Sequence, residues 1–298
     1  MDWNQTARLE RPLRAHDDAA WVAQLWRRPD ARLLPVTGRG RVGFRRPGEL
    51  DFVRPHGDFQ PDDGDILLGL VAGAPVFARV LADDDALRGL LGDDVRTGTL
   101  RAGMDEVDAD LDVGFAAAAL AQWHGRAAYC PACGQATRVI HAGQARHCDH
   151  CDTDLFCRTD PAVIMAVFDA ADRLLLGRQP VWAPRHVSVF AGYLEAGESA
   201  EQAVRRELAE EVGLRDLYDL RYIGSQPWPF PRSLMLGFTA RTPTSGVRVD
   251  GDEIEAARWF TREQLRAGLD AGEVALPSRR SIAHRMITTW LQGGQTQG

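Results

Sequence analysis

Three glutamates within a five-residue stretch form the densest group of reactive side chains in this 298-residue sequence. Glu207, Glu210 and Glu211 stand at positions i, i+3 and i+4, which places three carboxylates on one face of a helix. Like charges this close destabilise a helix unless a cation lies among them. Carboxylate oxygens on a rigid helix suit hard cations such as Mg²⁺ or Mn²⁺, and metal-bound phosphate is then the natural substrate. The alternative is a solvated acidic face.

Two pairs of cysteines indicate a second metal site. Cys130 and Cys133 form one CxxC pair, and Cys148 and Cys151 form another after fourteen intervening residues. Two such turns can complete a tetrahedral site of four thiolates, which suits Zn²⁺. Because no ligand position stays open for water, we expect a structural zinc. Two disulfides or unrelated core cysteines are the alternative. The nearby histidines that could compete as ligands are His141, His147 and His150.

A third segment could recognise a planar ring. Ser225 begins the run SQPWPFPRS, in which three prolines alternate with Trp228 and Phe230. The prolines predict a stiff, extended segment that presents both aromatic rings. A preformed aromatic surface can stack a heterocycle at low entropic cost. Taken alone, such a run is also typical of a packing loop.

The helix that must position the glutamates has recognisable ends. Ser199 suits the N-cap, and Gln202 three residues later completes a capping-box pattern. Gly213 suits the position just past the helix, where a left-handed backbone favours glycine. The sequence therefore predicts a helix over about 199–212, with the three carboxylates in its second half.

The rest of the chain predicts three domains: a small mixed α/β domain at 1–125, a zinc ribbon at 126–157 and a third domain at 158–298. In the first, strand-sized apolar runs at 65–71 and 76–81 indicate an antiparallel sheet. Further predicted strands cover 163–168, 174–176, 220–224, 234–239 and 257–260, and further predicted helices cover 111–126 and 281–291.

The composition excludes several function classes. The chain is 45% hydrophobic and 26% charged, as globular proteins are, with a net charge of −7 that argues against a chain-wide nucleic-acid footprint. All 35 basic residues are arginine, which excludes Schiff-base lysine chemistry and a P-loop lysine. The longest apolar stretch, Val113–Ala121, is far shorter than a membrane span. No signal peptide is recognisable, so we expect a cytoplasmic protein without membrane association.

The glutamates belong to a longer motif. The sequence satisfies G-x5-E-x7-R-E-U-x-E-E-x-G-U, where U is apolar, and its fixed positions are Gly192, Glu198, Arg206, Glu207, Glu210, Glu211 and Gly213. This string resembles the Nudix box of the Nudix hydrolases, which cleave nucleoside diphosphates linked to another moiety. The resemblance implies an α+β chain whose C-terminal domain is an α/β/α sandwich with a mixed sheet. A decayed box would leave a non-catalytic zinc-ribbon module that binds nucleic acid.

The two CxxC pairs, the Nudix box and the aromatic run follow one another in this order. That arrangement resembles the NADH pyrophosphatase branch of Nudix enzymes, whose members also remove NAD caps from RNA. The resemblance covers about 111–287. It implies a homodimer that uses Mg²⁺ or Mn²⁺ to hydrolyse NAD(H) to nicotinamide mononucleotide and AMP, with NAD-capped RNA as a further substrate. Redox chemistry is not implied, because the GxGxxG fingerprint is absent. ADP-ribose or dinucleoside polyphosphates are alternative substrates.

Site residues follow from the same resemblance. The implied metal ligands are Glu207, Glu211, Glu253 and the carbonyl of Ala191. Glu210 is a further ligand or the group that activates water, Arg206 orients the acidic side chains, and Glu198 supports them. Tyr193 and Trp228 are implied to stack on the nicotinamide, Trp228 from across a dimer interface. The other implied substrate contacts are Phe156, Gln226, Pro227, Pro229, Phe230, Pro231, Arg232, Ser233 and the backbone of Ala283.

Overall fold

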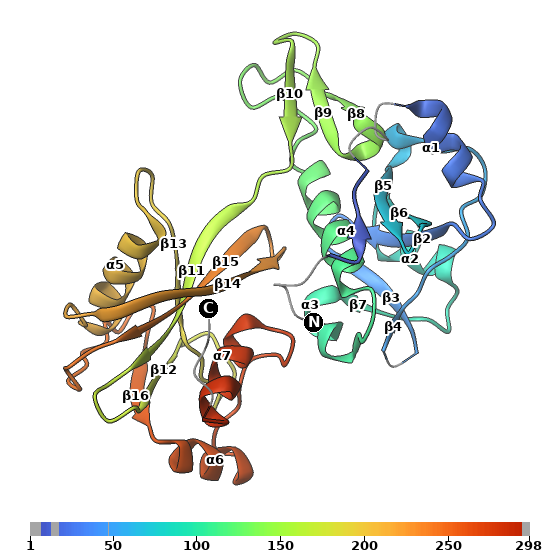
Figure 1. Cartoon of the computed structure of the whole chain (residues 1–298). Helices are drawn as coiled ribbons and strands as arrows, with labels where there is room; N and C mark the ends of the chain where they lie inside the picture. The colour runs from blue at the N-terminus through green and yellow to red at the C-terminus, as the bar shows by residue number, and fades with distance from the viewer. Residues whose placement is uncertain (1–6, 13–17, 47, 294–298) are drawn as a thin grey trace. The chain divides into compact units, whose positions relative to one another are not determined.

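The computed structural model describes residues 7–12, 18–46 and 48–293. Their contacts divide the chain into two compact units (Figure 1). Of the described residues, one unit contains those from 7 to 159 together with 229–232, and the other contains 160–228 and 233–293. No helix in the described ranges is long and apolar enough to cross a bilayer.

The N-terminal unit contains two small sheets. The first has the order β1-β5-β6-β2 and the second the order β4-β3-β7. The strands are β1 (Leu9–Glu10), β2 (Arg32–Thr37), β3 (Arg41–Arg46), β4 (Glu49–Leu50), β5 (Asp65–Val71), β6 (Ala74–Leu81) and β7 (Arg96–Thr99), and the helices are α1 (Ala19–Trp26), α2 (Asp84–Leu91), α3 (Leu100–Gly103) and α4 (Leu111–His124).

The expectation of an antiparallel first sheet was partly wrong. A tight turn makes β5 and β6 an antiparallel hairpin, as predicted, but β2 pairs with β6 in parallel. The turn between β5 and β6 is local, whereas β2 reaches β6 across more than thirty intervening residues. Local turn signals therefore predicted the β5–β6 hairpin, but they could not predict that β2 pairs with β6 in parallel.

The zinc ribbon follows α4 in the same unit. Its antiparallel sheet has the order β10-β9-β8, formed by β8 (Arg138–Ile140), β9 (Ala145–Cys148) and β10 (Thr153–Phe156). These strands are only three or four residues long. Sheets this small need a further constraint for stability.

The C-terminal unit contains a six-stranded mixed sheet with the order β14-β15-β11-β12-β16, in which β13 also pairs with β11. The strands are β11 (Asp160–Phe168), β12 (Leu174–Arg178), β13 (Phe190–Tyr193), β14 (Tyr218–Trp228), β15 (Ser233–Arg241) and β16 (Ala256–Phe260), and the helices are α5 (Ala200–Val212), α6 (Arg262–Asp270) and α7 (Ile282–Leu291). The pair β11–β15 is parallel and the other pairs are antiparallel.

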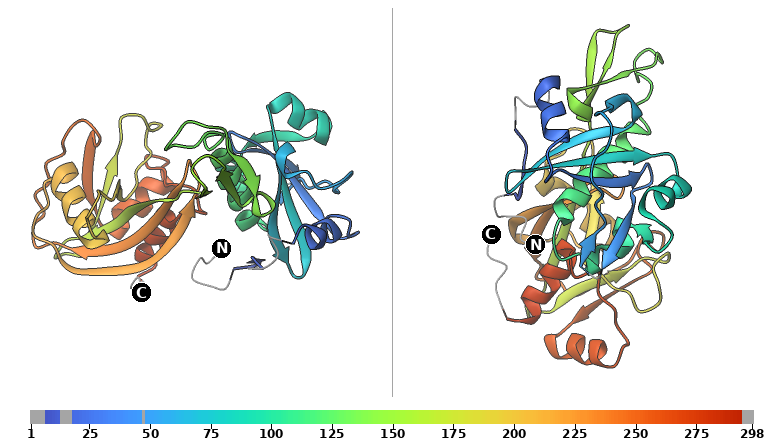
Figure 2. Two further views of the ribbon diagram at one scale, coloured as in Figure 1. Left: turned by 90° about the horizontal axis from the view of Figure 1, so that it is seen from above. Right: turned by 90° about the vertical axis from the view of Figure 1, so that its right-hand side faces the viewer.

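The central strand β11 is buried on both faces. Val163, Met165 and Val167 pack toward α5, while Ile164 and Ala166 pack into the cluster that contains α7. Successive side chains of a strand point to opposite faces, so one apolar run serves both layers. Helix α5 covers one face of the sheet and α6 with α7 the other (Figures 1 and 2). The predicted α/β/α sandwich with a mixed sheet is confirmed.

Helix α6 and strand β13 are the elements of the C-terminal unit that the sequence did not predict. The helix had a recognisable start. It is short, but Thr261 and Gln264 form a full capping box at its start. That pattern was the available signal, and nine residues with little apolar content obscured it.

Candidate active site

Both predicted ends of α5 are present. The Ser199 hydroxyl accepts a hydrogen bond from the Gln202 backbone N–H, and the Gln202 side chain accepts one from the Ser199 N–H. Gly213 closes the helix with a φ of 72°. These caps satisfy backbone groups that would otherwise be unpaired and hold the acidic turns of the helix in place.

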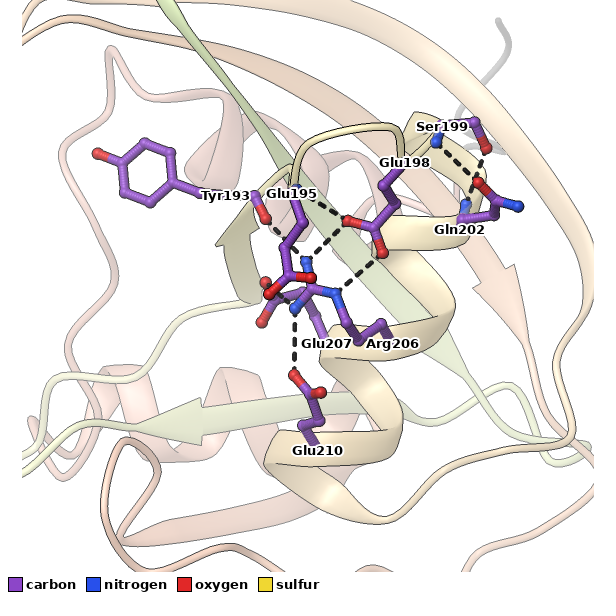
Figure 3. A network of polar contacts seen from close by, with 8 residues as sticks. All are labelled: Tyr193, Glu195, Glu198, Ser199, Gln202, Arg206, Glu207 and Glu210. Atoms are coloured by element: carbon purple, nitrogen blue, oxygen red, sulfur yellow. Dashed lines mark hydrogen bonds and ion pairs between the residues drawn. The ribbon is translucent and has the colours of Figure 1, made fainter.

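Arg206 connects this helix to the loop before it (Figure 3). Its guanidinium donates two hydrogen bonds of 2.9 Å to Glu198 and one of 2.8 Å to the carbonyl of Tyr193. It also donates to Glu207 at 2.8 Å and to Glu210 at 3.1 Å. The Glu198 hydrogen bonds raise the pKa of Arg206, and in turn they lower the pKa of Glu198. One permanent cation thus contacts all three of these carboxylates.

The predicted carboxylates differ sharply in exposure. Glu207 and Glu211 are buried, whereas the Glu210 side chain is 60% exposed and Glu253 is exposed. The pKa of Glu207 is raised, mainly because the side chain is buried. Burial, followed by the charges of Glu207 and Glu253, raises the pKa of Glu211 to about 8. Two of the four therefore sit where water cannot solvate a negative charge.

Glu211 carries the clearest sign of a cation site. Its Oε2 atom is buried and has no hydrogen-bond partner among the described residues. An unpaired buried carboxylate oxygen beside other carboxylates is costly unless a cation neutralises it. In the described ranges, no three acidic side chains are grouped closely enough to hold a metal ion in this structure. The chemistry of this hard-oxygen donor set nevertheless fits Mg²⁺ or Mn²⁺, the cations that Nudix enzymes use.

The backbone of β13 lies directly against this helix. A Cβ added at Gly192 would lie 1.9 Å from the Cδ of Glu207. Only glycine can therefore hold this position while the buried carboxylate keeps its place. Ala191, the predicted backbone ligand, precedes it in β13, where it pairs with Ile164 of β11.

The structure places Tyr193 beside Ser233. Tyr193 is 54% exposed, and its ring points away from Arg206 (Figure 3). Its hydroxyl lies 3.0 Å from the Ser233 hydroxyl in hydrogen-bond contact. Two of the predicted substrate residues, 40 positions apart in the sequence, thus meet in the C-terminal unit.

The aromatic run is not extended throughout. Strand β14 ends at Trp228, and 229–232 form a turn that groups with the N-terminal unit. There Phe230 contacts Phe115 edge to face at 5.6 Å, and Gln122 donates a 2.8 Å hydrogen bond to the carbonyl of Pro229. The expectation that Phe230 is presented on an extended segment was wrong, because packing against α4 captures its ring.

Gln226, a predicted substrate contact, is fully buried. Its amide nitrogen donates a 2.7 Å hydrogen bond to the carbonyl of Arg280, and its amide oxygen accepts a 2.6 Å bond from the Ile282 N–H. The side chain therefore ties β14 to the start of α7, next to Ala283, which is itself buried. No local sequence signal predicts this tie, which joins residues more than fifty positions apart.

Asp250 is a further residue that the sequence reading missed. Its carboxylate accepts hydrogen bonds from the backbone N–H groups of Asp252, Glu253 and Ile254, and it adds to the negative charge that raises the pKa of Glu211. It thus shapes the turn that carries Glu253. The pattern DGDE, an aspartate followed by glycine in a turn, was the available signal.

The four cysteines meet as predicted. The sulfur atoms of Cys130, Cys133, Cys148 and Cys151 all lie within 4.8 Å of one another. Backbone hydrogen bonds lower the pKa of the Cys130 thiol to about 7, whereas a hydrogen bond with Cys133 is the main cause that raises the pKa of the Cys151 thiol to about 12. His147 is hydrogen bonded to Asp154 at 2.7 Å instead. Phe156 ends the same sheet with 61% of its surface exposed.

Comparison with known proteins agrees with this arrangement. Residues 158–283 match the NUDIX domain family, and residues 126–156 match the NADH pyrophosphatase zinc ribbon domain family. Together with the sandwich fold and the capped acidic helix, these matches show that the chain belongs to the Nudix hydrolases. Within that family it belongs to the branch that carries the NADH pyrophosphatase zinc ribbon. Its four grouped cysteines are therefore the structural zinc site.

Full-length relatives belong to the same branch. The chain is 37% identical over 292 residues to the NAD-capped RNA hydrolase NudC of Mycobacterium bovis and to that of Mycobacterium tuberculosis, with 91% of this chain and 87% of each relative covered. It is 40% identical over 182 residues to the NAD-capped RNA hydrolase NUDT12 of Homo sapiens, with 57% of this chain and 39% of the relative covered.

Proposed function

We propose that this protein hydrolyses the pyrophosphate of NAD(H) to nicotinamide mononucleotide and AMP, and removes NAD caps from RNA by the same reaction. The observation that carries the proposal is Glu211, whose buried and unpaired oxygen lies among further carboxylates on the Nudix helix. The names of the full-length relatives supply the substrate class.

The proposed roles follow from charge and exposure. Glu207, Glu211, Glu253 and the carbonyl of Ala191 would hold Mg²⁺ or Mn²⁺, which when bound neutralises phosphate oxygens and promotes ionisation of water. Glu210 is the exposed carboxylate beside this group and is the candidate to accept the proton of the attacking water. Arg206 holds the box carboxylates in position.

Recognition of the substrate is assigned to the aromatic residues. Tyr193 offers an exposed ring whose hydroxyl Ser233 orients, and Trp228 is proposed as its stacking partner. We retain as proposals the contacts of Phe156, Ala283 and the 226–233 segment, a homodimer, a cytoplasmic location, and the domain boundaries 1–125, 126–157 and 158–298.

Product analysis tests the reaction. Purified protein is incubated with NADH, NAD-capped RNA, ADP-ribose or a dinucleoside polyphosphate, with Mg²⁺ or Mn²⁺, and the products are separated by chromatography. AMP and nicotinamide mononucleotide from NADH support the proposal. Faster cleavage of ADP-ribose or the dinucleoside polyphosphate would contradict it, and inactivity on every substrate would favour the non-catalytic alternative.

A further inference from the structure

A cluster of arginines surrounds a cavity in the C-terminal unit, outside the candidate active site. The cavity has a volume of about 360 Å³, and the residues that matter to its chemistry are Phe168, Asp172, Asp219, Arg221, Arg241 and Arg262, with Trp290 beside them. None of them belongs to the Nudix box or to the aromatic run. A cavity of this size is within the range of small-ligand sites.

The three arginines share two carboxylates. Asp172 pairs with Arg241 at 3.1 Å and with Arg262 at 2.7 Å. Asp219 pairs with Arg221 at 2.6 Å and lies 4.0 Å from Arg241. Three permanent positive charges against two negative charges leave the cluster with a net charge of +1. The lining therefore favours an anion over a cation or a neutral ligand.

Aromatic rings hold two of these guanidinium groups. Arg262 lies over the Trp290 ring at 4.8 Å, and Arg241 lies over the Phe168 ring at 5.8 Å. Both rings are buried, and the Trp290 indole donates a hydrogen bond to the carbonyl of Asp172. Arg262 also donates a 2.8 Å hydrogen bond from its Nε to the Trp290 carbonyl. A guanidinium group has five N–H donors, so both arginines keep donors that can bind oxygen atoms. Planar, oriented donors of this kind suit phosphate.

This cavity is remote from the candidate active site. Strands β11 and β15 run in parallel from the pair Asp160 and Ser233 to the pair Phe168 and Arg241. At about 3.3 Å per residue, the cavity lies roughly 26 Å along the strands from Ser233. Arg221 and Arg241 therefore do not contact a dinucleotide bound at Tyr193. A longer ligand that extends from that site has the reach to arrive here.

We propose that this cavity, which we call the arginine pocket, binds a backbone phosphate of the RNA that follows the cap. The proposal rests on the proposed function, because it requires a substrate with an RNA chain. A free nucleotide offers the same phosphate chemistry, and the experiment separates the two sources. The pocket would add affinity for capped RNA and none for NAD(H).

Equilibrium binding tests the pocket without any catalytic readout. The probes are an uncapped RNA of about 12 nucleotides, AMP and inorganic phosphate. Arg221→Ala is the main variant, because this side chain is 63% exposed and its removal should not unfold the protein. Arg215→Ala is the matched control, an exposed arginine of the same unit that does not line the pocket. Arg221→Lys keeps the charge and removes the planar fork.

We expect Arg221→Ala to weaken RNA binding about tenfold, as for loss of a charged hydrogen bond, with Arg221→Lys between it and the wild type. The slope of log affinity against log salt should become shallower by about 0.7 for one lost phosphate contact. NADH turnover should stay unchanged. Unchanged RNA affinity, or an equal loss in Arg215→Ala, would overturn the proposal. A loss confined to AMP and phosphate would overturn the RNA assignment. If NAD-capped RNA were not cleaved while the uncapped RNA still bound through Arg221, the proposed cap removal would fail and the pocket would remain an RNA phosphate site, since these probes carry no cap.

Discussion

The buried carboxylate of Glu211 opposes folding at any pH where it is charged. Its pKa in the folded chain, about 8, lies above the ordinary value of 4.5. A raised carboxylate pKa means that stability is fully present below pH 4.5 and is lost as the pH rises through 8. A bound cation would reverse this cost by pairing with the charge.

We therefore predict opposite effects of Glu211→Gln on stability and activity. In a chelator, the wild type should lose a few kcal/mol of unfolding free energy between pH 6 and pH 9, and the variant should lose less. Turnover of NADH with saturating Mg²⁺ should fall by orders of magnitude. Denaturant unfolding at both pH values and a product assay provide the measurements. Near wild-type turnover in the variant would remove Glu211 from the metal ligands.

Trp228 provides a residue-scale test of recognition. If its ring stacks on the nicotinamide, Trp228→Ala should weaken NADH binding by ~1–3 kcal/mol, or roughly 5- to 150-fold. ADP-ribose lacks that ring and should be spared. Tyr193→Phe should be mild, because it keeps the stacking face and loses only the hydrogen bond to Ser233. Equal losses for NADH and ADP-ribose would mean that Trp228 maintains loop shape.

At the scale of elements, the site depends on how closely β13 approaches α5. Gly192→Ala should displace Glu207, because the new Cβ would lie 1.9 Å from its Cδ. We expect a large loss of turnover with secondary structure retained, measured by product assay and circular dichroism. Gly246→Ala is the control, since a Cβ there would meet only Thr244 at 3.9 Å. Wild-type turnover of Gly192→Ala would show that the strand can move away freely.

A second contact between elements is the tie that Gln226 makes from β14 to α7. Gln226→Ala leaves the Arg280 carbonyl and the Ile282 N–H without their partner and should cost about 2–4 kcal/mol of stability. Gln292→Ala, at an exposed position after α7, should change stability little. Thermal unfolding of both variants decides the matter. A stable Gln226→Ala whose KM for NADH alone rises would instead support the predicted substrate contact.

At the scale of the whole molecule, the C-terminal unit and the zinc ribbon are stabilised differently. The C-terminal unit buries apolar clusters on both faces of its sheet, whereas the zinc ribbon has only short strands. A module that cannot bury a core of its own depends on its metal for folding. The four cysteines thus form a structural zinc site, whose thiolate ligands differ from the carboxylate oxygens on α5.

Cys148→Ser should release this zinc and destabilise the middle of the chain, where the zinc ribbon lies. Elemental analysis of the wild type should find about one zinc per chain, as a four-thiolate site requires. Protease sensitivity near 126–157 should rise in the variant. Cys157→Ser, outside the tetrad, is the matched control. A wild type without zinc, or a variant as protease-resistant as the control, would contradict a structural role of this zinc site.

Local sequence determined the parts of the site that depend on spacing alone. The capping residues Ser199, Gln202 and Gly213 set the length of α5, and the 3.6-residue period placed its glutamates together. CxxC spacing likewise sufficed to predict the cysteine tetrad. These features require only residues close in the chain, whose geometry the backbone dictates.

Tertiary structure decided what depends on distant partners. Burial left Glu211 without a hydrogen-bond partner while Glu210 stayed exposed, although both stand on the same acidic stretch. The hydrogen bonds of the Gln226 amide and the ring contact between Phe230 and Phe115 likewise join residues far apart in the chain. Sequence spacing sets which side chains share a face, but only packing determines which of them lose contact with water, and that loss sets their charge and chemistry.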